Sequence, residues 1–265
     1  MLYRDRVTRR PLRLLHTSDV HLGPRSFEPT GLLHTHECLC PVGVIESIVD
    51  AEQVDVVLIA GDLFDHARVS EELVVTTLSR LGALRADVAL LPGNHDVFDD
   101  IAVYRRHRGE LEASSIHFFD EPAGRIADLA DGALRIWARA MEAHTPHNHP
   151  LADPPPHPGD RWFVAAAHGH FVESPIDDAH RSSRISIESI EATAADYVAL
   201  GHWHVTTDLS ARGVRRPAWY PGAPLFGYGA GQMLLIDFVP GVGPVVRPVP
   251  VLNHAASRCI ETAKV

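Results

Sequence analysis

The sequence lacks the features that mark membrane or secreted proteins. Among its 265 residues, no uninterrupted apolar run approaches the ~20 residues needed to span a bilayer. The arginine-rich first residues are not followed by the apolar core of a signal peptide. Three cysteines, an odd number, do not make a disulfide framework. We therefore expect no membrane association and a cytoplasmic location.

Positive charge is also scarce. The chain has 24 Lys and Arg residues against 34 Asp and Glu residues, a formal net charge of −10 at pH 7. Lys and Arg contacts to phosphates drive binding to nucleic acids. We therefore do not expect the whole surface of this protein to attract nucleic acids. A local patch stays open as an alternative. Residues 105–108 read Arg-Arg-His-Arg and could bind a phosphate backbone, although a solvated helix face is the favoured interpretation.

Histidine, by contrast, is abundant, with 18 residues. It is the commonest metal ligand and the usual proton carrier near neutral pH. Ordinary surface histidines are expected to account for about half of them. The function of the chain therefore depends on where the remaining histidines lie.

The first part of the chain alternates strands and helices. Buried strands are predicted over residues 12–18, 54–60 and 88–91, with helices over 41–52 and 70–84. Pro41 suits the first position of a helix, and Ser70 suits an N-cap. The right-handed crossover rule makes the three strands parallel, so their C-terminal ends gather at one edge, where α/β sheets bind ligands.

The second part of the chain is predicted to contain mostly short strands. They are expected near residues 116–119, 133–138, 162–167, 197–200, 204–209, 218–220 and 233–239, with helices at 100–108 and 186–195. The proline-rich stretch from His144 to Gly159 is predicted to be a long loop, either solvated or in contact with substrate. The tail from Pro240 is expected to wrap the surface. Without a repeat or a boundary, we expect a single domain over residues 1–265, with its core in about 12–240.

Polar residues follow several of these strands where each one ends. On an extended backbone, residues i and i+2 point to the same face, so Asp19 and His21 are expected to leave their strand together. The full set of strand-end residues is Asp19, His21, Asp62, Asn94, His95, His168, His202 and His204. Any one of them could instead be a turn or cap residue. Two aspartates, the asparagine and four of these histidines form a mixed nitrogen and oxygen set of seven ligands that suits Zn, Mn or Fe rather than Ca or Mg alone. Seven ligands suit two ions that share a bridging carboxylate.

Five segments, in order, resemble the motifs of the calcineurin-like metallophosphoesterases over roughly residues 12–240. They are Asp19-x-His21, Gly61-Asp62-x-x-Asp65, Gly93-Asn94-His95-Asp96, His168 and Gly201-His202-x-His204. The sequences of residues 15–23, 60–65 and 220–224 are similar to those of the SbcD-type DNA-repair exonucleases. The resemblance implies a four-layer αββα sandwich, in which two mixed sheets are flanked by helices.

The resemblance also implies a role for each ligand. Asp62 would bridge two divalent metal ions, manganese in the first place and iron or zinc as alternatives. The ligands of one ion would be Asp19, His21 and His204, and those of the other Asn94, His168 and His202.

His95 is not needed as a ligand in that arrangement. It would act at the leaving-group oxygen as general acid or charge stabiliser. Asp65 or Asp96 would orient it, and the sequence leaves open which.

The implied activity is hydrolysis of a phosphodiester by metal-activated water, as in a DNA exonuclease. SbcD-type subunits usually continue into a DNA-capping region and an ATPase-binding segment, whereas this chain ends soon after its last predicted strand. No separate capping domain is therefore expected, and an ATPase partner is not favoured. The alternative is a stand-alone phosphodiesterase or phosphatase acting on nucleotides or other small phosphoesters. A metal-binding scaffold without catalysis is a third possibility, which the intact His95 disfavours. A homodimer is an expectation from the family alone.

Overall fold

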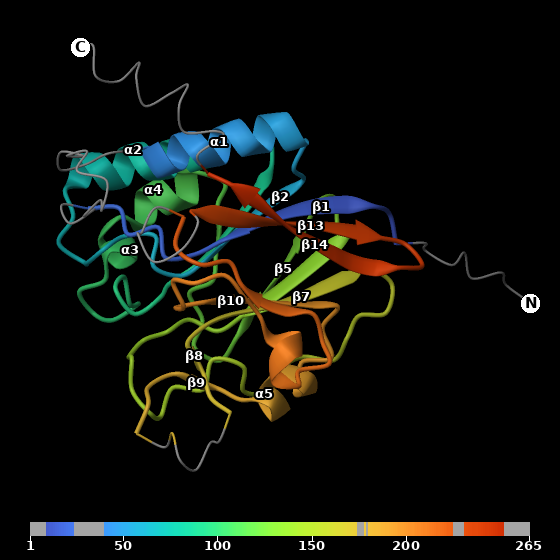
Figure 1. Ribbon diagram of the computed structural model, residues 1–265. Helices are drawn as coiled ribbons and strands as arrows, with labels where there is room; N and C mark the ends of the chain where they lie inside the picture. The colour runs from blue at the N-terminus through green and yellow to red at the C-terminus, as the bar shows by residue number, and fades with distance from the viewer. Residues whose placement is uncertain (1–8, 24–39, 174–177, 179, 225–230, 252–265) are drawn as a thin grey trace, which may run out of the picture.

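The computed structural model describes residues 9–23, 40–173, 178, 180–224 and 231–251. In this part of the chain two six-stranded sheets pack face to face, and α1 and α2 lie across the outer face of one of them (Figure 1). The four-layer α/β sandwich with two mixed sheets is thus confirmed. Among the described residues, no helix is both long enough and apolar enough to cross a bilayer.

The first sheet has the strand order β14-β13-β1-β2-β3-β4. Its parallel strands are β1 (Leu12–Thr17), β2 (Val56–Ala60), β3 (Asp87–Leu91) and β4 (His117–Phe118). Two antiparallel strands, β13 (Gln232–Val239) and β14 (Gly243–Pro250), complete it. The helices that connect or follow the parallel strands are α1 (Cys40–Glu52), α2 (Glu71–Gly82), α3 (Val103–Arg106) and α4 (Arg108–Ala113).

The second sheet has the strand order β11-β12-β10-β7-β6-β5. Its four central strands are parallel: β6 (Leu134–Ala138), β7 (Trp162–His168), β10 (Tyr197–Gly201) and β12 (Ala218–Tyr220). Antiparallel strands β5 (Arg125–Leu129) and β11 (Thr207–Asp208) form its edges. The remaining elements are the short pair β8 (His170–Phe171) and β9 (Arg184–Ile185), α5 (Ile187–Ala192) and the 3-10 turn η1 (Leu209–Arg212).

Alternation of side chains along β1 and β2 builds two of the apolar layers. Leu15 and Val57 pack toward the helices, whereas Leu14 and Val56 pack toward the second sheet. Because both faces of these strands are buried, they read as continuous apolar runs rather than as alternating ones. A third cluster, on the far face of the second sheet, includes Ile190 of α5.

Most of the predicted elements are present. Ser70 caps α2, since its side chain accepts a hydrogen bond from the N–H of Leu73. The expected strand at 204–209 is reduced to the two residues of β11, and the helix expected at 100–108 is divided at His107 into α3 and α4. Strand β5 was not predicted, because it lies at a sheet edge and only Leu129 of its residues is buried.

The tail from Pro240, which was expected to wrap the surface, instead adds a strand to the first sheet. Residues 243–250 form β14, which pairs along its whole length with β13. The strand carries Pro244, Pro248 and Pro250, and such residues normally argue against a strand because proline has no N–H to donate. They are tolerated here because β14 is the edge of the sheet, where prolines also discourage pairing with another chain.

Candidate metal centre

The strand-end residues meet where the C-terminal ends of both sheets come together. Two glycines allow this close approach. A Cβ on Gly201, at the end of β10, would lie 1.9 Å from the carbonyl oxygen of Ala60 at the end of β2. A Cβ on Gly93 would lie 2.1 Å from Oδ1 of Asp62. Both motif glycines are therefore explained by the crowding of backbone and carboxylate at this edge.

Asp19, His21 and His204 form the first of two candidate ligand groups. Oδ1 of Asp19 lies 3.6 Å from Nε2 of His204 and 4.0 Å from Nε2 of His21. The other oxygen, Oδ2, accepts hydrogen bonds from the hydroxyl of Ser18 at 2.5 Å and the N–H of His202 at 3.0 Å. One carboxylate oxygen is thus anchored, and the other faces two imidazoles.

The second group converges on the side-chain oxygen of Asn94. Nε2 of His168 lies 3.0 Å from it, and Nδ1 of His202 lies 2.9 Å from it. Nδ1–H of His168 donates to the carbonyl oxygen of Ala60 at 2.9 Å. This bond fixes the tautomer of neutral His168 and leaves Nε2 as the nitrogen that could bind a metal ion.

Asp62 lies between the two groups. Its Oδ1 accepts a hydrogen bond from the N–H of His95 at 2.9 Å. Its Oδ2 lies 3.4 Å from Nε2 of His168 and 3.9 Å from Nε2 of His21. The carboxylate therefore offers one oxygen to both sides of the site.

The backbone at the ligands is left-handed. Asp19, His21 and Asp62 have φ angles of 53°, 52° and 55°, values that non-glycine residues seldom adopt. The N–H groups of Val20 and His21 both donate to the carbonyl oxygen of Asp62, at 2.8 and 3.0 Å, and hold the two loops together. Asp19 and His21 are thus brought together by two left-handed residues beyond the strand end, and not by the extended backbone that we expected. Such strain persists where the surroundings impose it, which is common at functional sites.

The structure separates the two aspartates between which the sequence could not choose. Nδ1 of His95 lies 2.8 Å from the carbonyl oxygen of Asp65 and 3.5 Å from its Oδ1. The same Oδ1 lies 3.5 Å from Nδ1 of His21, so Asp65 stands between the two imidazoles. The side chain of His95 is 42% exposed, which leaves it open to a substrate.

Asp96 has a different environment. Its carboxylate is buried and accepts hydrogen bonds from the N–H groups of Leu63, Phe64 and Gly93 and from the hydroxyl of Tyr104. These donors come from the loops after β2 and β3 and from α3. Asp96 therefore ties two ligand-bearing loops together, and its oxygens are engaged by these groups rather than by the ring of His95.

Burial and charge shift the acidities at the centre in opposite directions. Burial alone would raise the pKa of Asp62, but the charges of His168 and His21 outweigh it and lower the pKa. Burial alone would lower the pKa of His168, but Asp62 outweighs it and raises the pKa to about 9. Burial, reinforced by the negative charge of Asp62, raises the pKa of Asp96 to about 6. Asp62 is thus held as a carboxylate, the form that binds metal.

The side chains at the centre fit divalent metal ions. Oδ1 of Asp19 is buried and has no hydrogen-bond partner among the described residues, an arrangement that costs free energy unless a cation compensates it. Candidate ligand atoms form three groups, and the atoms inside each group lie within 4.8 Å of one another. The groups are Asp19, His21 and His204; His21, Asp62 and His95; and Asp19, Asp62 and His168. Imidazole and carboxylate donors together suit transition metals such as Mn, Fe or Zn.

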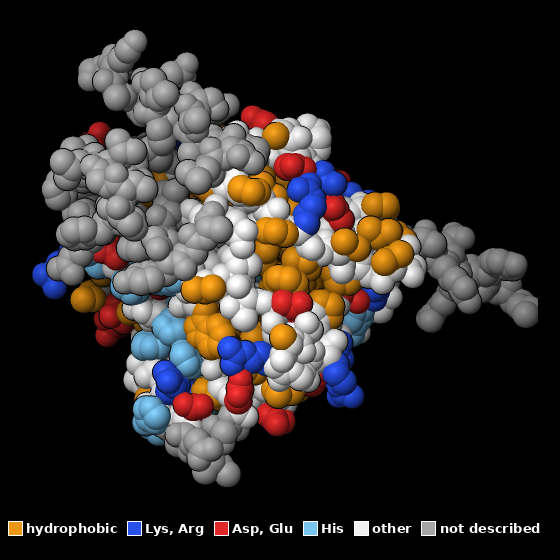
Figure 2. Space-filling view, viewed as in Figure 1, with side chains coloured by type: hydrophobic (Ala, Val, Ile, Leu, Met, Phe, Trp, Pro, Cys, Tyr) orange, Lys and Arg blue, Asp and Glu red, His pale blue; other side chains and the backbone are white. Residues whose placement is uncertain are grey.

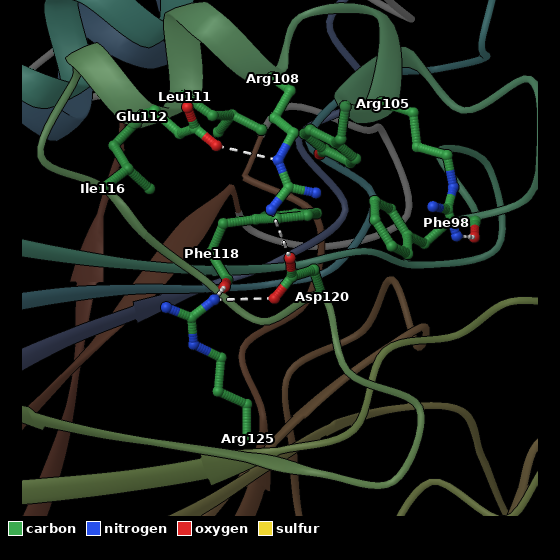
Figure 3. A pocket seen from close by; sticks show the side chains of 10 residues that line it. Phe98, Arg105, Arg108, Leu111, Glu112, Ile116, Phe118, Asp120 and Arg125 are labelled. Atoms are coloured by element: carbon green, nitrogen blue, oxygen red, sulfur yellow. Dashed lines mark hydrogen bonds and ion pairs between the residues drawn. The ribbon is translucent and has the colours of Figure 1, made fainter.

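The basic run at residues 105–108 lies on α3 and at the start of α4. Arg105, Arg108 and Arg125 line a pocket of about 280 Å³. Figure 3 shows these side chains around it. Each has an internal partner. Arg108 and Arg125 pair with Asp120, and Arg105 donates to the carbonyl oxygen of Asp99 and covers the ring of Phe98. Their charges are largely compensated within the protein, which fits the solvated-face interpretation better than a phosphate-binding track.

The loop from His144 to Gly159 has two different ends. His157 packs against Phe163 near the start of β7, and its Nε2 lies 3.1 Å from Oδ2 of Asp196. The ring of His144, in contrast, lies 5.5 Å, between centroids, from the ring of His202. In Figure 2 histidine side chains gather on the face that carries β8 and β9.

Comparison with known proteins agrees with the geometry. The model of the calcineurin-like phosphoesterase family matches residues 12–206. The chain is 28% identical to the SbcD subunit of the SbcCD nuclease of Rhodobacter capsulatus, over 92% of this chain and 72% of that protein. It is 33% identical to the DNA double-strand break repair protein Mre11 of Methanopyrus kandleri, over 80% of this chain and 49% of that protein.

Solved structures share the fold at low sequence identity. The protein TT1561 of Thermus thermophilus is 9% identical, with a TM-score of 0.57 over 91% of this chain and all of that one. The calcineurin-like phosphoesterase YfkN of Bacillus subtilis is 12% identical, with a TM-score of 0.52 over 96% of this chain and 97% of that one. With the matched family model and the clustered ligands, this chain belongs to the calcineurin-like phosphoesterase family and is a phosphoric ester hydrolase.

Proposed function

We propose that the protein is a dinuclear metal-dependent phosphodiesterase that hydrolyses DNA. The observation that carries the two-metal part is the position of Asp62, whose Oδ2 faces His168 on one side and His21 on the other. Asp19, His21 and His204 would hold one ion, and Asn94, His168 and His202 the other. We propose manganese as the metal, with iron or zinc as alternatives.

Two bound ions would supply an acidified water and positive charge for the phosphoryl oxygens. The remaining need is a proton for the leaving oxygen once its bond to phosphorus breaks. His95 is the group proposed to supply it. Asp65 accepts from Nδ1 and stabilises the protonated ring, and Nε2 on the opposite side of the ring donates to the leaving oxygen.

DNA is proposed as substrate because the relatives that cover most of this chain are named as nuclease and DNA-repair proteins. The bacterial relative is named as a subunit, so we include a partner subunit in the proposal, contrary to the expectation drawn from the length of the tail. A second candidate is a nucleotide or other small phosphoester. The net charge of −10 and the internally paired arginines of the 105–125 region favour it.

A panel of substrates separates these proposals. The Mn-loaded chain is assayed with bis(p-nitrophenyl) phosphate, p-nitrophenyl phosphate, cyclic nucleotides, and single- and double-stranded DNA. The proposal predicts turnover of the chromogenic diester and of DNA, with weaker activity on the monoester. Activity on cyclic nucleotides without cleavage of DNA would favour the second candidate instead.

His95→Ala tests the proton donor in the same panel. We expect kcat to fall about 10²-fold or more while the metal content stays unchanged. His149→Ala is the matched control, since His149 is exposed and takes no part in the proposed site. Equal turnover of His95→Ala and wild type would remove the proposed role of His95.

A further inference from the structure

His144 lies at the edge of the metal centre, in a loop that hydrogen bonds hold in place. Its exposed ring lies 5.5 Å, between centroids, from the ring of His202, whose Nδ1 contacts Asn94. The loop that carries it is secured on both sides. Phe98 donates from its N–H to the carbonyl oxygen of Met141 at 2.8 Å, and Ser183 donates from its N–H to that of Thr145 at 2.9 Å.

Ser183 is the residue on which the loop is anchored. It is completely buried, its φ angle is 48°, and its carbonyl oxygen accepts from the N–H of His170 at 2.9 Å. Its hydroxyl lies 3.0 Å from Nδ1 of His144 and 2.9 Å from Nδ2 of Asn148. A buried serine in a left-handed conformation therefore fixes both the loop and the orientation of the His144 ring.

These contacts select the tautomer of His144. Asn148 donates to the hydroxyl of Ser183, and that hydroxyl has one proton to give. The candidates to receive it are Nδ1 of His144 at 3.0 Å and the sulfur of Met141 at 3.8 Å, a much weaker acceptor. With Nδ1 accepting, the ring proton of neutral His144 is on Nε2, on the opposite side from Ser183.

We infer that His144 is a substrate-binding residue, whose Nε2–H donates a hydrogen bond to an oxygen of the phosphoester held at the metal centre. This inference rests on the proposed phosphodiesterase function. The ring is exposed, it is fixed from behind, and its donor is directed away from its anchor.

A purely structural role would predict something else. If His144 served only to hold the loop, Nδ1 would be the atom that matters, and an asparagine could replace it. If the ring serves the substrate, Nε2 is the atom that matters, and a glutamine, whose amide nitrogen lies at a similar position, could replace it. His144→Asn and His144→Gln therefore test the two ends of the same ring.

The experiment measures kcat and KM of the Mn-loaded full chain with bis(p-nitrophenyl) phosphate. A bond to a charged oxygen is made in the bound substrate and in the transition state alike, so its loss raises KM more than it lowers kcat. We expect KM to rise about ten-fold or more in His144→Ala and His144→Asn, with kcat within about three-fold of wild type. His144→Gln is expected to recover most of the wild-type KM, and His149→Ala to match wild type.

The two proposals fail in different ways. If the wild-type protein loaded with metal does not hydrolyse the diester, the proposed function is wrong. If it does, and His144→Ala keeps the wild-type KM, the role of His144 is wrong. A wild-type KM in His144→Asn with a raised KM in His144→Gln would also overturn it, since the contact with Ser183 would then be the important one.

Discussion

The two sheets contribute to the metal centre in different ways. The loops after β1 and β2 supply Asp19, His21 and Asp62, which are almost inaccessible and have left-handed backbone conformations. The second sheet supplies imidazoles. His168 ends β7 and is buried, but His204 lies in a bend after β10, and its side chain is 37% exposed.

Charge explains the difference. A buried carboxylate must be surrounded by donors to remain ionised, and these donors need a tightly packed backbone. In the first sheet, the buried Asp96 helps to pack the backbone in this way, because it accepts hydrogen bonds from the loops after β2 and β3. A neutral imidazole needs one acceptor to fix its tautomer, as Ala60 does for His168. The first sheet therefore provides a rigid, charged half of the centre, and the second sheet a half with fewer constraints.

The largest expected effect is on the rigid half. Asp96→Ala leaves three buried N–H groups and the hydroxyl of Tyr104 without their acceptor. We expect the free energy of unfolding of the metal-free protein to fall by about 3–5 kcal/mol, as measured by urea denaturation.

Asp100→Ala is the matched control for Asp96→Ala. Asp100 is exposed, and we expect a change within about 0.5 kcal/mol. If the free energy of unfolding falls by less than about 1 kcal/mol in Asp96→Ala, the hydrogen bonds to Asp96 do not hold the loops of the first sheet together.

The next effect concerns the contact between the two halves. His16 of β1 is buried between the sheets, with Nδ1 lying 2.9 Å from the hydroxyl of Tyr197 of β10. Burial lowers its pKa from 6.5 to about 3. The unfolded chain therefore takes up this proton first as the pH falls. The stability that neutral His16 contributes is complete above pH 6.5 and declines towards pH 3, by about 1.4 kcal/mol per pH unit.

His16→Leu checks this pH dependence. Unfolding free energies of the metal-free wild type and the variant are compared between pH 6.5 and 5 by urea denaturation. We expect the slope of the variant to be shallower by about one proton, whatever its absolute stability. Parallel slopes would mean that His16 is not the group that titrates.

The smallest effect on stability is expected in the second half. His204→Ala removes a side chain that is 37% exposed, so the free energy of unfolding of the metal-free protein should change by less than about 0.5 kcal/mol. The affinity for Mn²⁺ at the site formed by Asp19, His21 and His204 should nevertheless fall about ten-fold or more, as measured by calorimetric titration. A large loss of stability without metal would place His204 in the rigid half instead.

The sequence predicted the architecture because its signals are local. The apolar runs of β1, β2 and β7, and the cap at Ser70, depend on neighbouring residues alone. Strand β14 could not be predicted, because its prolines are compatible with a strand only at a sheet edge, and that position is set by tertiary structure.

The sequence predicted which residues gather at the candidate site, but it could not predict their geometry. Asp96 is adjacent to His95 in the chain, whereas Asp65 belongs to another motif. Only the folded loops show that Asp65 contacts the ring while Asp96 bonds to backbone. His144 carries no motif. Its proximity to His202 arises from the anchor at Ser183, a contact between segments distant in the chain.

The number of metal ions per chain tests the central claim most directly. The protein is loaded with Mn²⁺, freed of excess metal, and its metal content is measured by mass spectrometry for wild type and Asp62→Asn. Because Asp62 is proposed to join both ligand groups, we predict two ions per chain in the wild type and fewer than two in the variant. One ion in the wild type, or two in Asp62→Asn, would contradict the bridging role of Asp62 and with it the dinuclear centre.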